Sequence, residues 1–343
     1  MAAVDSVTRS RPTMREVAAL AGVSLKTVSR VINGEPAVSG ELASRVRAAI
    51  ERLDYRHNRA ASSLRRSDGK SAAIGLLLED VANPFSSALH REIENVALRR
   101  GVLVFAGSSD EDAARERSLI AEFTSRRVDG LIIVPASHDH SYLLNERRAG
   151  TAMVFVDRPA GFLDVDTVLT DNEGGTREGI AHLIAQGHRR IGYLGDLQTI
   201  ATAAWRYRGY MNELAAQRLE ADPRLVRLNL RGIEKAEIAA GELLSTSPPP
   251  TALFAGQNLL TIGAYRALRK LNLHKRIALV GFDDFLLADL LEPAITVVAQ
   301  DAGALGRAAA EQLFRRLDGD RSPSVHEVLS NRLITRGSGE VRP

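Results

Sequence analysis

The chain has 343 residues and no cysteine, with 45% hydrophobic and 25% charged residues. This composition is typical of a folded globular protein of two or three domains, and the lack of thiols excludes disulfides, thiol catalysis and cysteine-bound metal. No apolar stretch approaches the roughly 20 residues of a membrane helix, and the start of the chain lacks a signal-peptide pattern. We therefore expect a cytoplasmic protein with no membrane partner.

Positive charge is concentrated near the start of the chain. Residues 1–70 contain 13 Lys and Arg against 7 Asp and Glu, a balance of +6, which leaves 32 against 35, a balance of −3, for the rest. A basic segment on a mildly acidic body indicates a polyanionic partner for that segment alone. A solvated arm is the alternative if the segment lacks helical order.

Residues 13–57 are predicted to form three short helices, preceded by a disordered leader over 1–12. Each helix begins at a hydroxyl cap: Thr13 (with Glu16 completing a capping box), Ser24 and Ser39. Apolar residues at helical spacing give each helix an inner face: Val17, Leu20 and Ala21, then Val28, Val31 and Ile32, then Leu42, Val46, Ala49, Ile50 and Leu53. Gly22 ends the first helix, so the segment has the form of a helix-turn-helix.

The outer face of the second predicted helix suits DNA. Lys26 and Arg30 are four residues apart and lie on one face, from which both can reach guanine edges in a major groove. Short hydroxyl side chains commonly contact phosphate. The residues predicted to contact DNA from this helix are Ser24, Leu25, Lys26, Thr27, Ser29, Arg30 and Asn33. A solvated polar face on an ordinary three-helix module is the alternative.

From Ala72 onward, apolar stretches of strand length alternate with amphipathic stretches of helix length. The predicted strands are AIGLLLED (73–80), VLVFAGS (102–108), VDGLIIVPA (128–136), AMVFVDR (152–158), IGYLGD (191–196), TALFAGQ (251–257) and IALVGFDD (277–284). This alternation predicts parallel sheets with helices on both faces, and the units exceed one sheet. We expect an α/β body of two doubly wound lobes: an N-lobe of about 72–170 and 300–325, and a C-lobe of about 171–299 and 326–343.

Polar residues follow the predicted strands, at the edge where parallel sheets bind ligands. These strand-end stretches are rich in Asp, Asn and Ser and include one aromatic residue, Phe85. Planar polar side chains that contact several hydroxyls, with an aromatic ring against the C–H face, are what a sugar site requires. The alternative is that strand ends in any α/β protein are polar turns.

Several motifs resemble the lactose-repressor (LacI/GalR) family of bacterial transcriptional regulators. They are VAALAGVSLKTVSRVIN (17–33) in the basic segment, and RRVDGLIIVPA (126–136), VFVDRP (154–159) and VGFDDF (280–285) in the body. The resemblance implies a helix-turn-helix head and a body like the periplasmic sugar-binding proteins. It also implies a repressor whose affinity for operator DNA is controlled by a small carbohydrate-like effector bound between the lobes, with no cofactor.

The resemblance also implies a hinge helix and linker over 58–71. Asn58 is placed to cap this helix, and Leu64 stands where the family has a leucine that wedges into the operator minor groove. The alternative for Leu64 is packing on the next domain. His57 replaces the proline that relatives usually have, so the start of this helix is less constrained.

Seven residues match effector contacts of the family, and they are Asn83, Phe85, Asp157, Arg206, Asn258, Asp283 and Gln300. Asn258 stands where the family usually has aspartate, and an amide both donates and accepts whereas a carboxylate only accepts. Arg206 suits either a carboxylate or phosphate of the ligand or a carboxylate of the pocket. The sequence leaves open which sugar binds and whether it induces or co-represses.

Other classes of protein fit less well. The chain contains no GxSxG, P-loop, GxGxxG or HExxH motif, and we expect no catalysis. The stretch ASHDH (136–140) has two histidines and an aspartate, a composition that suggests a metal site. The stretch is expected to lie in an exposed turn, however, which favours a solvated loop. A transport or chemosensory sugar-binding protein would need an export signal and no basic helix-turn-helix.

A homodimer is predicted because one small head offers too little surface for tight binding to DNA. Two heads would read a near-palindromic operator, and apolar faces of the body would supply the dimer contact. The sequence ends LITRGSGEVRP without the heptads of the coiled coil that makes the lactose repressor a tetramer. The expectation is therefore a dimer rather than a tetramer.

Overall fold

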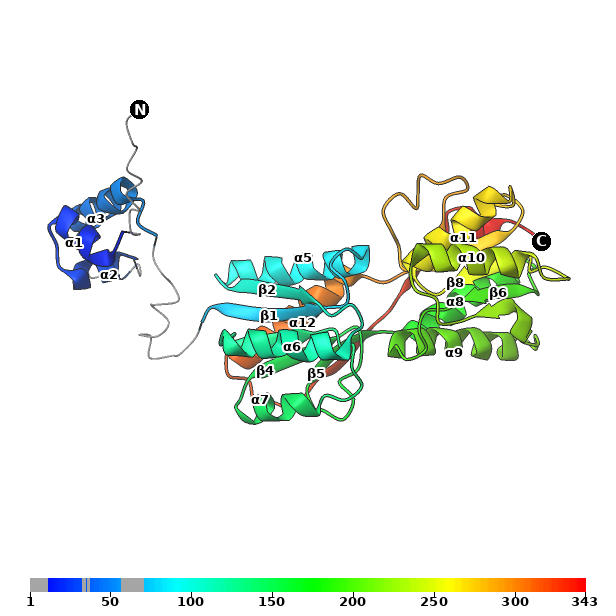
Figure 1. Ribbon diagram of the computed structural model, residues 1–343, viewed down its shortest axis with the longest axis horizontal. Helices are drawn as coiled ribbons and strands as arrows, with labels where there is room; N and C mark the ends of the chain where they lie inside the picture. The colour runs from blue at the N-terminus through cyan, green and yellow to red at the C-terminus, as the bar shows by residue number, and fades with distance from the viewer. Residues whose placement is uncertain (1–11, 33–34, 36–37, 57–70) are drawn as a thin grey trace, which may run out of the picture. The chain divides into compact units, whose positions relative to one another are not determined.

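The structure, a computed structural model, describes residues 12–32, 35, 38–56 and 71–343 (Figure 1). The chain divides into two compact units, residues 1–71 and residues 72–343. Several sequence predictions lie outside the described residues: the leader up to residue 11, Asn33, His57, Asn58, Leu64 and the proposed hinge helix. None of the helices in the described ranges is long and apolar enough to cross a membrane.

The first unit contains the three predicted helices, α1 (Met14–Ala21), α2 (Leu25–Ile32) and α3 (Gly40–Leu53). The capping box at Thr13 is present, and Gly22 ends α1 with a φ of 62°, in the left-handed region that favours glycine. The small core contains most of the predicted inner face. Leu20 is an error of the prediction: it is 44% exposed, and Ala18 is buried instead, while Val17 and Ala21 are buried as predicted. At about 100° per residue, the buried face of α1 is turned by about 50° from the predicted one.

The first lobe of the body is a parallel sheet of six strands in the order β11-β5-β4-β3-β1-β2. Its elements are β1 (Ala73–Leu78), α5 (Pro84–Arg99), β2 (Leu103–Ser108), α6 (Ala113–Ser125), β3 (Gly130–Ile133), a 3-10 turn (Ser141–Leu143), α7 (Leu144–Arg148), β4 (Ala152–Val156), β5 (Asp166–Thr170), α12 (Ala302–Leu317) and β11 (His326–Leu329). Helices α5 and α12 pack on one face and α6 on the other. Figure 1 shows α5 and α6 on opposite sides of the sheet.

The second lobe contains the other six-stranded sheet, in the order β12-β10-β9-β8-β6-β7, with only β12 antiparallel. Its elements are α8 (Asn172–Ala185), β6 (Ile191–Leu194), α9 (Ala201–Ala216), a 3-10 turn (Pro223–Leu225), β7 (Val226–Arg227), α10 (Gly232–Leu244), β8 (Ala252–Ala255), α11 (Asn258–Lys270), β9 (Ala278–Phe282), β10 (Thr296–Ala299), β12 (Arg332–Ile334) and a 3-10 turn (Ser338–Glu340). Helices α10 and α11 cover one face, and α8 and α9 cover the other.

The chain passes between the lobes three times, after β5, after β10 and after β11. Strand β11 pairs with β5 in the first sheet, with His326 opposite Thr167. The predicted lobe boundary at 326 is therefore wrong by one strand, because the chain returns to the second lobe only for β12.

All seven predicted strands are present, but the sequence pattern missed the short edge strands β7, β11 and β12 and, beside the strands that border the cleft, β5 and β10. The last two have only five and four residues, DTVLT and TVVA, and their Thr and Asp residues break the apolar run. Both lie next to the strands whose ends form the cleft between the lobes, so their omission hid part of the site.

Candidate functional site

The exposed side of α2 presents the residues predicted to meet DNA. Lys26 and Leu25 are exposed, and Arg30 is partly exposed. Arg30 Nε lies 3.5 Å from Glu35 Oε2, an ion pair open to solvent that costs little to break. Ser24 Oγ accepts the backbone N–H of Thr27, so this hydroxyl caps the helix as predicted.

Arg45 was not noticed in the sequence, and it stabilises the turn between α1 and α2. Its Nη2 donates to the backbone oxygen of Ala21 over 2.7 Å, at the C-terminal end of α1. A cation favours this end of a helix, where carbonyl groups lack partners. A Cβ on Gly22 would lie 2.7 Å from the same Nη2 atom, so another residue here would strain the backbone at its φ of 62° and also displace the Arg45 side chain.

A narrow cleft with a cavity volume of about 40 Å³ lies between the two lobes of the body. Its lining residues are Glu79, Asn83, Phe85, Asp157, Arg158, Asp196, Ile200, Thr202, Ala203, Arg206, Gly256, Gln257, Asp283 and Gln300. Six of the seven residues matched to effector contacts are in this set. Asn258 is the exception: it is fully buried and hydrogen-bonded to Asn83, and its neighbour Gln257 lines the cleft instead.

Two aspartates face the cleft from corresponding positions of the two lobes. Asp157 follows β4 with a φ of 70°, and Asp283 follows β9 with a φ of 69°. Each backbone N–H still bonds the neighbouring strand, at the carbonyl oxygens of Val168 and Val298, both over 2.9 Å. The left-handed turn directly after the strand therefore directs each carboxylate toward the cleft while the sheet remains paired.

Arg206 of α9 is buried, with 6% of its side chain exposed, and is bound within its own lobe. Its Nε donates to Asn172 Oδ1 (2.7 Å), and its Nη1 donates to Gly256 O (2.8 Å) and to Asp283 Oδ2 (3.2 Å). The guanidinium also lies over the ring of Phe282 at 3.8 Å. The question left open by the sequence is resolved for this structure: Arg206 pairs with a carboxylate of the pocket.

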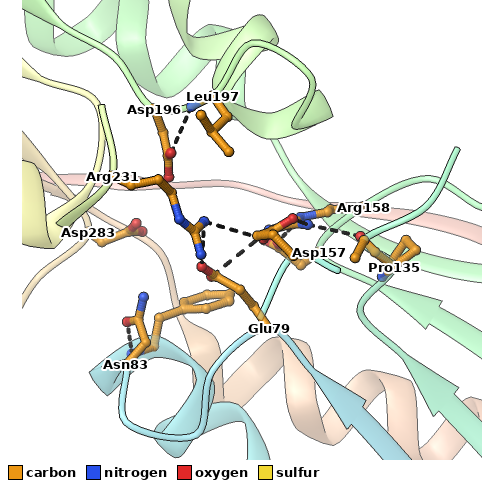
Figure 2. A network of polar contacts seen from close by, with 12 residues as sticks. Glu79, Asn83, Pro135, Asp157, Arg158, Asp196, Leu197, Arg231 and Asp283 are labelled. Atoms are coloured by element: carbon orange, nitrogen blue, oxygen red, sulfur yellow. Dashed lines mark hydrogen bonds and ion pairs between the residues drawn. The ribbon is translucent and has the colours of Figure 1, made fainter. Parts of the chain in front are cut away.

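A second group of charges connects the lobes at the cleft, as Figure 2 shows. Arg158 donates from both Nη atoms to Glu111 (2.8 and 2.5 Å) and from Nη1 to Pro135 O (2.9 Å). Arg231, from the start of α10 in the second lobe, reaches Glu79 of the first lobe at 3.1 Å. Arg231 thus places a positive charge from one lobe among carboxylates of the other.

Carboxyl groups outnumber guanidinium groups in the cleft. Five carboxylates and three guanidinium groups meet there, a surplus of two negative charges when all are ionised: Glu79, Glu111, Asp157, Asp196 and Asp283 against Arg158, Arg206 and Arg231. Burial raises the pKa of Glu79 to about 7, against the opposing effect of Arg158. Burial also raises the pKa of Asp157 and of Asp196.

Some cleft residues were within reach of sequence reasoning and others were not. Glu79, Arg158, Asp196 and Gln257 stand in the strand-end stretches but were not singled out. No sequence pattern identified Arg231 as a cleft residue, because it follows a two-residue strand in a segment without clear periodicity. Arg231 was therefore recognisable only from the folded structure.

The histidines of ASHDH have separate surroundings. His138 Nε2 lies 2.6 Å from Thr199 O of the second lobe. His140 is buried, with its Nδ1 3.1 Å from Ala160 O, so its placement in an exposed turn was wrong. Among the described residues, no group of three His, Cys, Asp or Glu side chains is arranged to hold a metal ion.

Both units match known sequence families. Residues 13–58 match "Bacterial regulatory proteins, lacI family", and residues 180–339 match "Periplasmic binding protein-like domain". The HTH-type transcriptional regulator CelR of Thermobifida fusca is 33% identical, over 96% of this chain and 99% of its own length. GalR of Escherichia coli (strain K12) is 30% identical, over 95% of each chain.

Solved structures agree with these matches. A CelR–cellobiose complex has a TM-score of 0.69 at 31% identity, covering 96% of this chain and all of that one. A lac repressor dimer bound to operator and an anti-inducer has a TM-score of 0.85 at 25% identity, covering 96% and 99%.

A helix-turn-helix head followed by a two-lobed α/β body defines the class of DNA-binding transcriptional regulators with a periplasmic-binding-like core. The chain belongs to the lacI family of bacterial regulatory proteins.

Proposed function

We propose that this regulator is a repressor released from, or recruited to, its operator by an uncharged sugar bound in the cleft. The observation that carries the proposal is the lining of the cleft. Asn83, Gln257 and Gln300 offer amides, Asp157 and Asp283 offer carboxylates, and Phe85 adds an aromatic ring to the lining. These are the groups that hydrogen-bond hydroxyls and pack on a sugar ring.

The charges of the cleft favour an uncharged ligand over an acidic one. Both Nη atoms of Arg158 donate to Glu111. Arg206 donates to Asp283 and to two neutral oxygens. A carboxylate or phosphate on the ligand would have to displace a pocket carboxylate, in a cleft where carboxyl groups outnumber guanidinium groups. The cellobiose complex of CelR supports a sugar as the ligand class.

Thermal shift of the full chain with a matched panel tests the ligand class. The panel contains neutral mono- and disaccharides, uronic or aldonic acids of the same skeleton, and the corresponding sugar phosphates. We expect stabilisation by a neutral member and none by its acidic counterparts. Tightest binding of an acid or phosphate would contradict the proposal.

Arg206→Ala tests whether the cleft controls DNA binding. Removing the guanidinium takes away a buried donor and leaves Asp283 less compensated, so the effector response should be lost. Operator affinity without effector should remain near the wild-type value, because the head folds on its own core. A variant that responds at the same effector concentration as wild type would show that Arg206 has no part in binding.

Reading of DNA by α2 is the second component of the proposal. Arg30 and Lys26 contact base edges, while Ser24, Thr27 and Ser29 contact or orient toward phosphates. Arg30→Ala should weaken binding to the true operator by about 1–3 kcal/mol and relax sequence choice. Equal losses on operator and random DNA would make Arg30 a phosphate contact only.

A homodimer is the assembly we propose, and the body supplies its surface. Exposed apolar residues gather on edge strand β2 and neighbouring α5 of the first lobe, and on the loop after β9 in the second: Leu98, Leu103, Phe105, Leu286, Leu287 and Leu290. We assign the dimer contact to these side chains, of which Leu286 is 81% exposed. Light scattering at micromolar concentration should give the mass of two chains, and a mass of four would contradict a dimer.

The operator is proposed to be near-palindromic, with one α2 helix in each half-site and two Leu64 side chains at its centre. Leu64→Ala should weaken operator binding and reduce DNA bending while leaving the dimer mass unchanged. Unaltered bending would favour packing of Leu64 on the body instead.

A further inference from the structure

A pair of side-chain amides joins the two lobes beside the cleft. Asn258 Nδ2 of the second lobe donates to Asn83 Oδ1 of the first lobe over 2.9 Å. Both residues are buried, with 0% and 6% exposed. Asn83 caps the N-terminus of α5, and Asn258 is the first residue of α11. The contact therefore connects the N-terminal ends of one helix from each lobe.

Backbone amides determine the orientation of both side chains. Asn83 Oδ1 also accepts the N–H of Phe85 (3.1 Å), and Asn258 Oδ1 accepts the N–H of Leu259 (2.7 Å). Rotating either amide by half a turn would place its NH₂ group against a backbone N–H and lose both bonds. Asn258 is therefore held as the donor and Asn83 as the acceptor, so the hydrogen bond has one polarity.

Asn83 belongs both to this pair and to the cleft. It lines the cleft, whereas Asn258 does not. The hydrogen bonds of Asn83 within the described residues use its oxygen and its backbone, and leave Nδ2 without a partner among them. One side chain thus has its oxygen committed to the opposite lobe and its NH₂ group available to a ligand hydroxyl.

We propose that Asn258 is a positioning residue, which holds Asn83 and the first lobe against the second without contacting the effector; the arrangement in which this contact is made is called closed below. A substitution at Asn258 would then change effector affinity only by changing how readily the two lobes close. This consequence rests on the proposed function of the cleft, but closure itself is a property of the free protein. If Asn258 served only to begin α11, an aspartate would serve equally well, because a helix N-terminus favours negative charge.

Two isosteric substitutions on the same hydrogen bond separate these possibilities. Asn258→Asp replaces the donor with an oxygen that faces Asn83 Oδ1. Asn83→Asp keeps an acceptor for both N–H groups and makes it charged, which strengthens such bonds. Both variants add the same charge at the same place, so a general effect of charge would change the ratio of closed to open protein in the same direction in both. Asn272→Asp, on the exposed surface beyond α11, is the control for charge outside the cleft.

Closure is measurable on the full chain because it contains no cysteine. Cysteines introduced at exposed Ala121 of α6 and Ala216 of α9 carry a donor and an acceptor dye, one on each lobe. Mixing labelled chain with excess unlabelled chain gives one labelled pair in each assembly. Energy transfer is then recorded without ligand and with the sugar that the panel identifies.

We expect Asn258→Asp to lower the ratio of closed to open protein about tenfold, and to weaken the sugar by a similar factor. Asn83→Asp and Asn272→Asp should show no such loss of closure in the free protein. An unchanged closed fraction in Asn258→Asp, or an equal loss in Asn83→Asp, would overturn the proposal. If no sugar binds the wild type, the proposed function fails, but the free-protein comparison still decides the role of Asn258.

Discussion

Each lobe buries one arginine at the cleft, and the two are compensated in different ways. Arg158 of the first lobe has 8% of its side chain exposed and is bound on two sides by Glu111, with two more carboxylates within 4 Å. Arg206 of the second lobe has 6% exposed and pairs with a single carboxylate, Asp283. Its other partners are neutral oxygens and an aromatic ring.

From this difference we expect Arg158 to contribute mainly to stability and Arg206 mainly to the response to a ligand. Arg158 is the main compensating charge for a group of buried carboxylates, so the fold of the first lobe depends on it. Arg206 pairs directly with Asp283, which also accepts a hydrogen bond from Gln300 Nε2 over 2.6 Å, and its charge acts on Asp157 without an ion pair. Because less of the fold depends on Arg206, its hydrogen bonds can change when a ligand enters the cleft.

The largest expected effect is that of Arg158→Met on stability. The substitution keeps much of the side-chain volume but leaves Glu111 and its neighbours without their cation, so the free energy of unfolding should fall by about 3–5 kcal/mol. Denaturant unfolding followed by circular dichroism measures this loss. Arg206→Met is the matched control and should cost less; an equal or larger loss would refute the distinction between the two arginines.

Glu79→Gln should change how stability depends on pH. The pKa of Glu79 is raised by burial from 4.5 to about 7, so the folded state binds this proton more tightly than the unfolded state, and stability falls as pH rises through this window. A glutamine at this position does not ionise, so this contribution to the pH dependence of stability is lost. The variant should gain about 2 kcal/mol relative to wild type between pH 5 and pH 7.5.

Thermal unfolding at the two pH values measures the relative gain, with exposed Glu292→Gln in the second lobe as the control. If Glu79→Gln and wild type change in parallel between the two pH values, the carboxylate of Glu79 is not the titrating group.

The smallest expected effect is that of Arg231→Met, which removes the ion pair between Arg231 and Glu79 across the cleft. One third of the Arg231 side chain is exposed, so solvent screens the pair and its loss should cost less than about 1 kcal/mol of stability. Unfolding under the conditions used for Arg158→Met provides the comparison. A loss as large as that of Arg158→Met would mean that the lobes are joined mainly through Arg231.

Local features of the sequence were sufficient for most of the architecture. Capping residues such as Thr13 and Ser39 were recognised because a cap bonds within its own helical turn. Six of the seven strands were recognised because buried parallel strands read as apolar runs, and the edge strand β2 has the same apolar pattern although Leu103 and Phe105 are exposed. Asp157 and Asp283 stand in the strand-end stretches where such sheets bind ligands, and the family resemblance singled them out within those stretches.

Only the tertiary structure determined how the cleft charges are paired and which residues stand behind the lining. The partner of Arg206 is 77 residues away, the partner of Arg231 is 152 residues away, and Asn258 bonds a residue 175 positions earlier. Local periodicity reports burial and secondary structure, whereas charge compensation depends on which chain segments meet in space. The sequence therefore identified the edge at which the site lies, and the fold decided that Arg206 faces a pocket carboxylate and that Asn258 contacts Asn83 rather than the cleft.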